Sequence, residues 1–184
     1  MNRAVFLDRD GVIVEDPYYT YRTDQLKLIP GSAKAIRLLN ENNFITVVVT
    51  NQAGIAKGYF TEEDTISFNQ SMKQKLMEHD AHIDAIYYCP HHPDAKIEKY
   101  KIDCDCRKPK PGMLKDAEKD FNIDLRRSFI IGDRLSDIDA GKCVGCKTIM
   151  VLTGYGKKKK KNNRIDYIAQ NLYDAITKIL KREK

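Results

Sequence analysis

The chain lacks the long apolar segments that a membrane protein needs. No hydrophobic run approaches the roughly 20 residues that span a bilayer, and the N-terminus does not show the basic, apolar and small-residue order of a signal peptide. The first absence excludes a predicted transmembrane anchor, and the second excludes a predicted secretory signal. We therefore expect a cytoplasmic protein with no membrane partner.

Cysteine is also too scarce, and too unevenly placed, for a disulfide framework. The chain has 5 cysteines, an odd number, and no secretory signal, whereas disulfide-rich domains belong to oxidising compartments. Metal ligation together with spare thiols is the better interpretation.

The length and the charge set further bounds. With 184 residues, 42% of them hydrophobic, and no internal repeat, the chain fits a single domain over residues 1–184. The net charge of +6 comes mostly from one lysine run at 157–161. A basic excess can indicate nucleic-acid, membrane-surface or anionic-substrate binding. We favour a solvated loop for this run over a binding patch.

Short buried strands alternate with amphipathic helices along the chain. Apolar runs predict strands at 4–8, 45–50, 85–88, 128–133 and 148–152, and helical spacing predicts helices at 32–42, 62–79, 111–121, 136–143 and 167–180. This alternation predicts a doubly wound, mostly parallel α/β sheet, in which ligands bind beyond the carboxyl ends of the strands.

Two carboxylates follow the first predicted strand. Asp8 and Asp10 are two residues apart and precede Gly11, which permits a tight turn. A carboxylate attacks phosphorus only if a cation offsets its repulsion from the phosphate, so Asp8 as a nucleophile implies magnesium and a basic side chain nearby. Asp10 can then act as acid and base. The alternative is a solvated Asp-Gly turn.

Polar groups follow two other predicted strands. Thr50 offers a hydroxyl group, and the backbone N–H groups after it can hold phosphate oxygens. Asp133 offers the second acid that a hard cation requires. We interpret Asp137 and Asp139 mainly as acids that favour the N-terminus of the following helix.

These motifs resemble, in order, the four motifs of the haloacid dehalogenase-like phosphatases: Asp8-Arg-Asp10-Gly-Val, Thr50-Asn-Gln, Lys108-Pro and Gly132-Asp133. The resemblance covers nearly the whole chain and implies a Rossmann-like fold. It also implies Asp8 as the nucleophile, Asp10 as the acid and base, Thr50 and Lys108 as phosphoryl stabilisers, and magnesium on Asp8, the Asp10 carbonyl and Asp133.

One irregular loop, residues 89–106, contains a ligand set suited to tetrahedral zinc: Cys89, His91, Cys104 and Cys106. We prefer His91 over His92 as the fourth ligand. Because four protein ligands leave no position for water, the zinc is expected to be structural, pinning the loop that carries Arg107 and Lys108. The second C-x-x-C pair, Cys143 and Cys146, has no accompanying ligands, and we interpret it as core or helix-end residues.

The zinc loop narrows the resemblance to the D-glycero-D-manno-heptose 1,7-bisphosphate 7-phosphatase family, with histidinol-phosphatases as relatives. Twelve residues separate His91 from Cys104, whereas the histidinol-phosphatases are similar but have a much shorter insert. The resemblance implies substrate contacts at Asp16, Pro17, Tyr18, Tyr19, Asn51, Gln52, Ala53, Arg107 and Arg134. The expected partner is a small sugar bisphosphate, the chain is expected to be a monomer, and nucleic acid is not expected to bind.

Other functions remain open from the residues alone. A histidinol-phosphatase or a nucleic-acid 3′ phosphomonoesterase would use the same strand-end groups, whereas Arg107 favours a substrate with a second anionic group. A zinc-dependent nucleic-acid binding module would explain the basic charge and the Cys/His loop. It leaves the strand-end acids without a role.

Overall fold

A single parallel sheet organises the computed structural model, which describes residues 1–16, 18–158 and 163–182. The strands lie in the order β3-β2-β1-β4-β5-β6, and every neighbouring pair is parallel. Their bounds are β1 Ala4–Leu7, β2 Ile45–Asn51, β3 Ala85–Cys89, β4 Phe129–Gly132, β5 Lys147–Val151 and β6 Tyr167–Ala169. The predicted doubly wound α/β architecture is confirmed.

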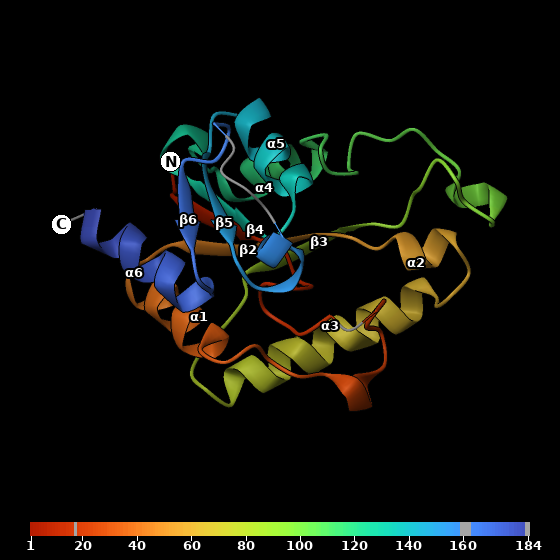
Figure 1. Ribbon diagram of the computed structural model, residues 1–184, viewed down its shortest axis with the longest axis horizontal. Helices are drawn as coiled ribbons and strands as arrows, with labels where there is room; N and C mark the ends of the chain where they lie inside the picture. Colours follow the sequence, from red (N-terminus) through yellow and green to blue (C-terminus); the bar gives the residue numbers. More distant parts are fainter. Residues whose placement is uncertain (17, 159–162, 183–184) are drawn as a thin grey trace.

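Helices cover both faces of this sheet (Figure 1). In Figure 1, α4 and α5 lie on one side of the sheet, and α1, α3 and α6 lie on the other. The α-helices are α1 Ser32–Glu41, α2 Ala53–Ala56, α3 Glu62–Met77, α4 Gly112–Phe121, α5 Leu135–Cys143 and α6 Leu172–Arg182. The short 3-10 helices are η1 Thr23–Gln25, η2 Glu98–Tyr100, η3 Leu125–Arg127 and η4 Gly154–Lys158. Among the described residues, no helix combines the length and the apolar character that crossing a bilayer requires.

The pleat of β1 explains why its sequence is apolar without alternation. Val5 and Leu7 pack against α1, α3 and α6, whereas Ala4 and Phe6 pack against α4 and α5. All four side chains are fully buried. A strand covered on both faces needs apolar residues at every position, and only its end can carry a polar group. Asp8 is that end residue.

The order in which strands are added to the sheet reverses between β1 and β4. From β1 the chain passes to β2 and β3 on one side, and it then returns to β4 on the other side of β1. In such sheets the crevice at this switch point receives ligands. Asp8 and Asp133 follow the two strands that flank the switch point, and they lie next to each other.

The predicted single helix over residues 167–180 is wrong at its start. Tyr167–Ala169 forms the edge strand β6, which pairs with β5, and α6 begins only at Leu172. Asn171 precedes the first residue of α6, and its side chain accepts a hydrogen bond from the backbone N–H of Asp174 at 2.9 Å. This bond caps the start of the helix. Three strand residues are too few for a period of two to stand out from the helical pattern that follows.

Candidate active site

Three buried acids meet at the switch point. Asp8 follows β1, Asp133 follows β4, and Asp137 lies in the first turn of α5. Their relative exposures are 7%, 0% and 1%, and each offers a carboxylate oxygen within 4.8 Å of the others. Because burial of a charge is costly unless it is compensated, this cluster requires cations.

Lys108 supplies one positive charge to the cluster. Its Nζ lies 3.1 Å from Asp8 Oδ1 and 2.6 Å from Asp137 Oδ1, and it donates a hydrogen bond to the carbonyl of Val49 at 2.6 Å. Burial works against the charged form, but the carboxylates of Asp137 and Asp8 outweigh it and raise the pKa of Lys108 to about 12. The lysine is therefore charged, and it balances only part of the negative charge.

Asp133 is the acid that Lys108 does not reach. Its Oδ2 accepts a hydrogen bond from the backbone N–H of Tyr155 at 2.7 Å, while its Oδ1 is buried and has no hydrogen-bond partner among the described residues. Burial and the charge of Asp8 raise the pKa of Asp133 to about 7. A buried carboxylate oxygen without a partner, beside a second carboxylate, fits a hard divalent cation such as magnesium.

Gly11 allows the loop that follows β1 to approach Asp133. Its φ is +81°, and a Cβ at this position would lie 2.5 Å from Asp133 Oδ2. Both the backbone conformation and the space therefore require glycine. The Asp10-Gly11 turn is thus packed directly against the acid cluster.

Asp10 lies outside the three-acid cluster. Its Oδ2 accepts a hydrogen bond from Gln52 Nε2 at 2.8 Å and lies 3.5 Å from Thr50 Oγ1. Gln52 Nε2 also contacts Thr50 Oγ1 at 2.9 Å. The polar groups that the sequence predicts at the carboxyl ends of β1 and β2 are therefore joined in one hydrogen-bond network.

The prediction for Asp137, an acid that favours the N-terminus of a helix, covers only part of its role. Its Oδ2 accepts a hydrogen bond from the backbone N–H of Arg134 at 3.0 Å, as expected of such an acid, while its Oδ1 pairs with Lys108. Asp139 instead pairs with Arg164 at 2.8 Å. The helical spacing that separates the two acids turns one inward and the other toward the surface.

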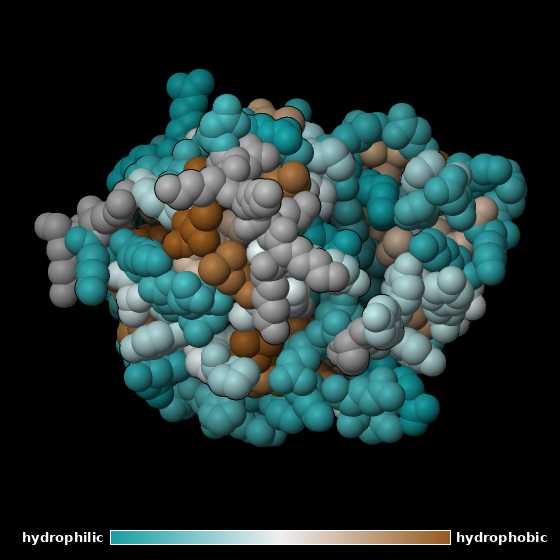
Figure 2. Space-filling model, in the orientation of Figure 1, coloured by the Kyte–Doolittle hydropathy of each residue, from teal (hydrophilic) through white to brown (hydrophobic). Residues whose placement is uncertain are grey.

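These groups open into a cavity of about 390 Å³. The predicted residues that line it are Asp8, Asp10, Asp16, Tyr18, Tyr19, Thr50, Asn51, Gln52, Ala53, Arg107, Lys108 and Arg134. Figure 2 shows a hollow bordered mainly by hydrophilic residues between the main body and the smaller part at the right. Pro17, a further predicted contact, lies outside the described residues.

Six lining residues were not predicted as site residues: Thr20, Lys57, His92, Ser136, Asp137 and Tyr155. Of these, Asp137 is predicted from the sequence only as a helix acid, and His92 is considered only as an alternative zinc ligand. Ser136 and Asp137 closely follow Asp133, so their nearness in sequence was a usable signal. Lys57 follows the short helix α2, and it lies at the cavity because the folded chain brings it next to Tyr19. No spacing rule identifies such a residue.

Lys57 and Arg107 line the cavity without an ion pair to an acid among the described residues, as does a third cation, Arg134. Lys57 Nζ donates a hydrogen bond to Tyr19 Oη at 2.8 Å, and a guanidinium nitrogen of Arg107 donates to the carbonyl of His91 at 3.0 Å. No acidic side chain in the described part of the chain forms an ion pair with either of them. Both remain available to an anionic ligand.

The predicted zinc ligands converge. The four donor atoms all lie within 4.8 Å of one another: Sγ–Sγ separations are 3.5 Å for Cys89–Cys104 and 3.2 Å for Cys104–Cys106, and His91 Nδ1 lies 3.9 Å from Cys89 Sγ and 3.6 Å from Cys106 Sγ. Donors bound tetrahedrally at zinc distances are separated by about 3.5–3.8 Å. The donor set therefore fits zinc.

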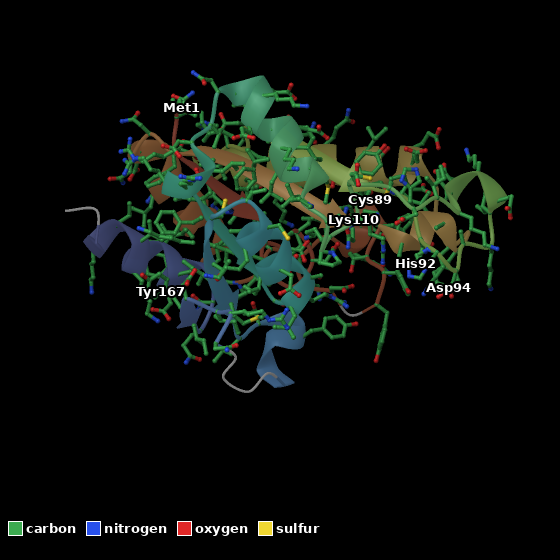
Figure 3. The ribbon with its side chains drawn as sticks, turned by 90° about the horizontal axis from the view of Figure 1, so that it is seen from above. Met1, Cys89, His92, Asp94, Lys110 and Tyr167 are labelled. Atoms are coloured by element: carbon green, nitrogen blue, oxygen red, sulfur yellow. The ribbon has the colours of Figure 1, made fainter. Side chains whose placement is uncertain are left out.

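The loop that holds these ligands is also anchored by hydrogen bonds. Tyr100 of this loop, together with Tyr88 of β3, donates to the carboxylate of Glu62 at the start of α3, at 2.7 and 2.8 Å respectively. The N–H groups of Lys96 and Ile97 both donate to the carbonyl of Ala56. Figure 3 shows Cys89, His92 and Asp94 in succession along the segment that leads away from the sheet. The loop is thereby fastened to α2 and α3 as well.

The second cysteine pair behaves as predicted. Cys143 is exposed at the end of α5, and Cys146 is buried in the core beside α4. Burial raises the pKa of Cys146 to about 12. An inert thiol of this kind is a core residue.

Comparison with known proteins identifies the family of this chain. Residues 105–175 match the HAD-hydrolase-like family model. The chain is 43% identical, over 100% of both chains, to the D-glycero-beta-D-manno-heptose-1,7-bisphosphate 7-phosphatase of Haemophilus influenzae. It is 40% identical to the enzyme of that name from Escherichia coli, covering 98% of this chain and 95% of the relative.

A solved structure agrees with the fold. The D,D-heptose 1,7-bisphosphate phosphatase from B. bronchiseptica, crystallised with magnesium and phosphate, superposes with a TM-score of 0.86 at 31% identity, covering 98% of this chain and 99% of that one. The sequence relatives share the full length of the chain, so the likeness is not confined to the catalytic motifs. The chain belongs to the D-glycero-beta-D-manno-heptose-1,7-bisphosphate 7-phosphatase family of haloacid dehalogenase-like hydrolases.

Proposed function

We propose that this protein removes the 7-phosphate of D-glycero-D-manno-heptose 1,7-bisphosphate, giving inorganic phosphate and the 1-phosphate. The observation that carries this proposal is one cavity lined by two different sets of charged groups. Asp8 and Lys108, 3.1 Å apart, can accept a transferred phosphoryl group, and the cations Lys57 and Arg107, which form no ion pair with an acid among the described residues, can hold a second phosphate. The names of the full-length relatives support the same substrate.

In the first half-reaction, a carboxylate oxygen of Asp8 attacks phosphorus and the bond from phosphorus to the sugar oxygen breaks. Asp10 donates a proton to the departing oxygen. Lys108 and Thr50 hold the phosphoryl oxygens. Magnesium, held by Asp8, the Asp10 carbonyl and Asp133, supplies when bound the positive charge that offsets repulsion between carboxylate and phosphate.

In the second half-reaction, Asp10 takes a proton from water, and the water oxygen attacks phosphorus of the aspartyl-phosphate. The phosphorus–oxygen bond to Asp8 breaks, which releases phosphate and restores the carboxylate. One residue can serve both steps because the leaving oxygen and the attacking water occupy the same side of phosphorus in turn. The hydrogen bond from Gln52 to Asp10 fits this role, since it holds the carboxylate toward the cavity.

Zinc has a structural role in this proposal. The four ligands Cys89, His91, Cys104 and Cys106 leave no open position, so the ion supplies cross-linking and not chemistry. Arg107 and Lys108 directly follow Cys106 in the chain. A fixed Cys106 therefore limits where both cations can lie.

The proposed substrate is tested by measuring phosphate release from a panel: both anomers of the heptose 1,7-bisphosphate, fructose 1,6-bisphosphate and histidinol phosphate. We expect the highest kcat/KM for a heptose bisphosphate with magnesium present, because a bisphosphate can use both sets of charged groups and the names of the full-length relatives specify the heptose. A higher kcat/KM for histidinol phosphate would replace the proposed substrate while leaving the phosphatase chemistry in place.

Arg107→Ala is expected to lower kcat/KM for the heptose bisphosphate by roughly tenfold or more, since charged hydrogen bonds contribute about 1.5 to 3 kcal/mol. A simple monophosphate lacks the distant phosphate and is expected to lose less. The measurement is the ratio of kcat/KM values for bisphosphate and monophosphate. Arg127→Ala, at an exposed arginine of η3, is the matched control. An unchanged ratio in Arg107→Ala means that Arg107 does not read the second phosphate.

Cys104→Ser is expected to remove zinc and to lower activity indirectly, because the segment carrying Arg107 and Lys108 loosens. Metal analysis of the wild type is expected to find about one tightly bound zinc per chain, which magnesium does not displace. Cys143→Ser, at an exposed thiol outside the cluster, serves as the control and is expected to retain zinc and activity. A zinc-free protein with full activity and an ordered loop refutes the assignment.

A further inference from the structure

Arg9, between the two acids of the catalytic loop, is buried to an unusual degree. Its relative exposure is 1%, and it is among the largest fully buried side chains among the described residues. A buried guanidinium is costly unless every part of it is paired. None of the chemistry proposed above uses it.

The guanidinium is almost fully paired. Its Nε lies 3.0 Å and 3.2 Å from the two carboxylate oxygens of Asp10, and a terminal nitrogen lies 3.0 Å from Asp10 Oδ1. The same terminal nitrogen donates to the carbonyl of Thr20 at 3.0 Å, and the other terminal nitrogen donates to Asn69 Oδ1 at 3.0 Å. The guanidinium carbon lies 4.5 Å from the centroid of the Phe68 ring.

These contacts join three separate segments. Asp10 belongs to the catalytic loop, Thr20 follows the cavity-lining residues Tyr18 and Tyr19, and Asn69 and Phe68 belong to α3. Arg9 therefore fastens the carboxylate of Asp10 to a helix that is itself packed in the core. On its other side, the same carboxylate is held by Gln52.

We propose that Arg9 is a positioning residue that fixes the carboxylate of Asp10 in the orientation needed for proton transfer. The inference rests on the proposed role of Asp10 as acid and base. The Nε–H of Arg9 meets both carboxylate oxygens at once, while the terminal nitrogens are held by Thr20 and Asn69. The rigid guanidinium plane therefore sets the orientation of the carboxylate as well as its position. A lysine ammonium cannot set that orientation, because it acts as a point charge.

The test uses the dependence of the reaction on its leaving group. The sugar oxygen departs as a poor leaving group and needs the proton of Asp10, whereas the nitrophenolate of p-nitrophenyl phosphate departs without one. kcat/KM reports the steps through the first phosphoryl transfer. A misplaced Asp10 therefore lowers kcat/KM for the sugar bisphosphate far more than for the aryl phosphate.

In Arg9→Met and Arg9→Lys we expect the sugar-to-aryl ratio of kcat/KM to fall at least tenfold, with Arg9→Lys the milder of the two. Asn69→Ala loosens the guanidinium without removing its charge, and we expect a smaller fall in the same direction. This variant keeps the test decisive if Arg9→Met does not fold. Thermal melting of each variant reports its folding.

Asp10→Asn tests the acid role of Asp10 separately from the positioning role of Arg9. If Asp10→Asn leaves the sugar-to-aryl ratio unchanged, the proposed acid role of Asp10 fails. If Asp10→Asn lowers the ratio but folded Arg9→Lys and Asn69→Ala lower kcat/KM equally for both substrates, Arg9 is only structural and the present inference is overturned.

Discussion

Asp8→Asn is expected to abolish phosphate release, with a loss of roughly 10⁴-fold or more in kcat, as for other nucleophile replacements. The amide has no negative charge with which to attack phosphorus and is a poorer ligand for magnesium. It also weakens the partner of Lys108, whose ammonium lies 3.1 Å from the carboxylate. Purified variant and wild type are compared at saturating substrate and magnesium.

Two controls separate chemistry from folding in this experiment. Asparagine has nearly the size of aspartate, so the thermal midpoint of the variant is expected to stay close to that of the wild type or to rise, because one charge leaves a cluster of three buried acids. Asp139→Asn removes a surface acid that pairs with Arg164, and it is expected to remain active. Near-normal turnover of Asp8→Asn contradicts the covalent mechanism.

Asp10→Asn is expected to give the second largest loss, about 10²- to 10⁴-fold in turnover of the sugar bisphosphate, the usual contribution of a positioned acid and base. Both half-reactions suffer, because the amide neither donates the proton to the leaving oxygen nor accepts one from water. Folding is expected to survive, since the asparagine oxygen still accepts from Arg9. If activity survives as well, Asp10 is only a residue of the turn.

The positions of the strand-end groups were predictable because a doubly covered parallel sheet restricts polar residues to strand ends. The apolar run before Asp8 and the one before Asp133 both identify such an end. The zinc ligands were predictable for a different reason, since thiols and imidazoles are rare and their spacing within one loop is distinctive. In the described structure, the acids at the strand ends lie together at one site and the four predicted zinc ligands lie together at another.

Other features follow from packing between distant segments, which a linear pattern does not contain. Arg9 sits in the sequence as an ordinary charged residue of a turn, and only the approach of Asn69 from α3 makes it a buried fastening point. Lys57 reaches the cavity because α2 turns the chain back toward Tyr19. The dual role of Asp137 depends on Lys108, which arrives from 29 residues earlier in the sequence.

The measurement that tests the central claim most directly is chemical trapping of the aspartyl-phosphate. In Asp10→Asn the aryl phosphate can still phosphorylate Asp8, since its leaving group needs no proton, while hydrolysis lacks its base. The phosphorylated form should therefore accumulate. Rapid quenching followed by borohydride reduction is expected to convert residue 8, and no other acid, to homoserine in the peptide map, with no conversion in Asp8→Asn. Conversion at another residue, or none while phosphate is still released, contradicts Asp8 as the nucleophile.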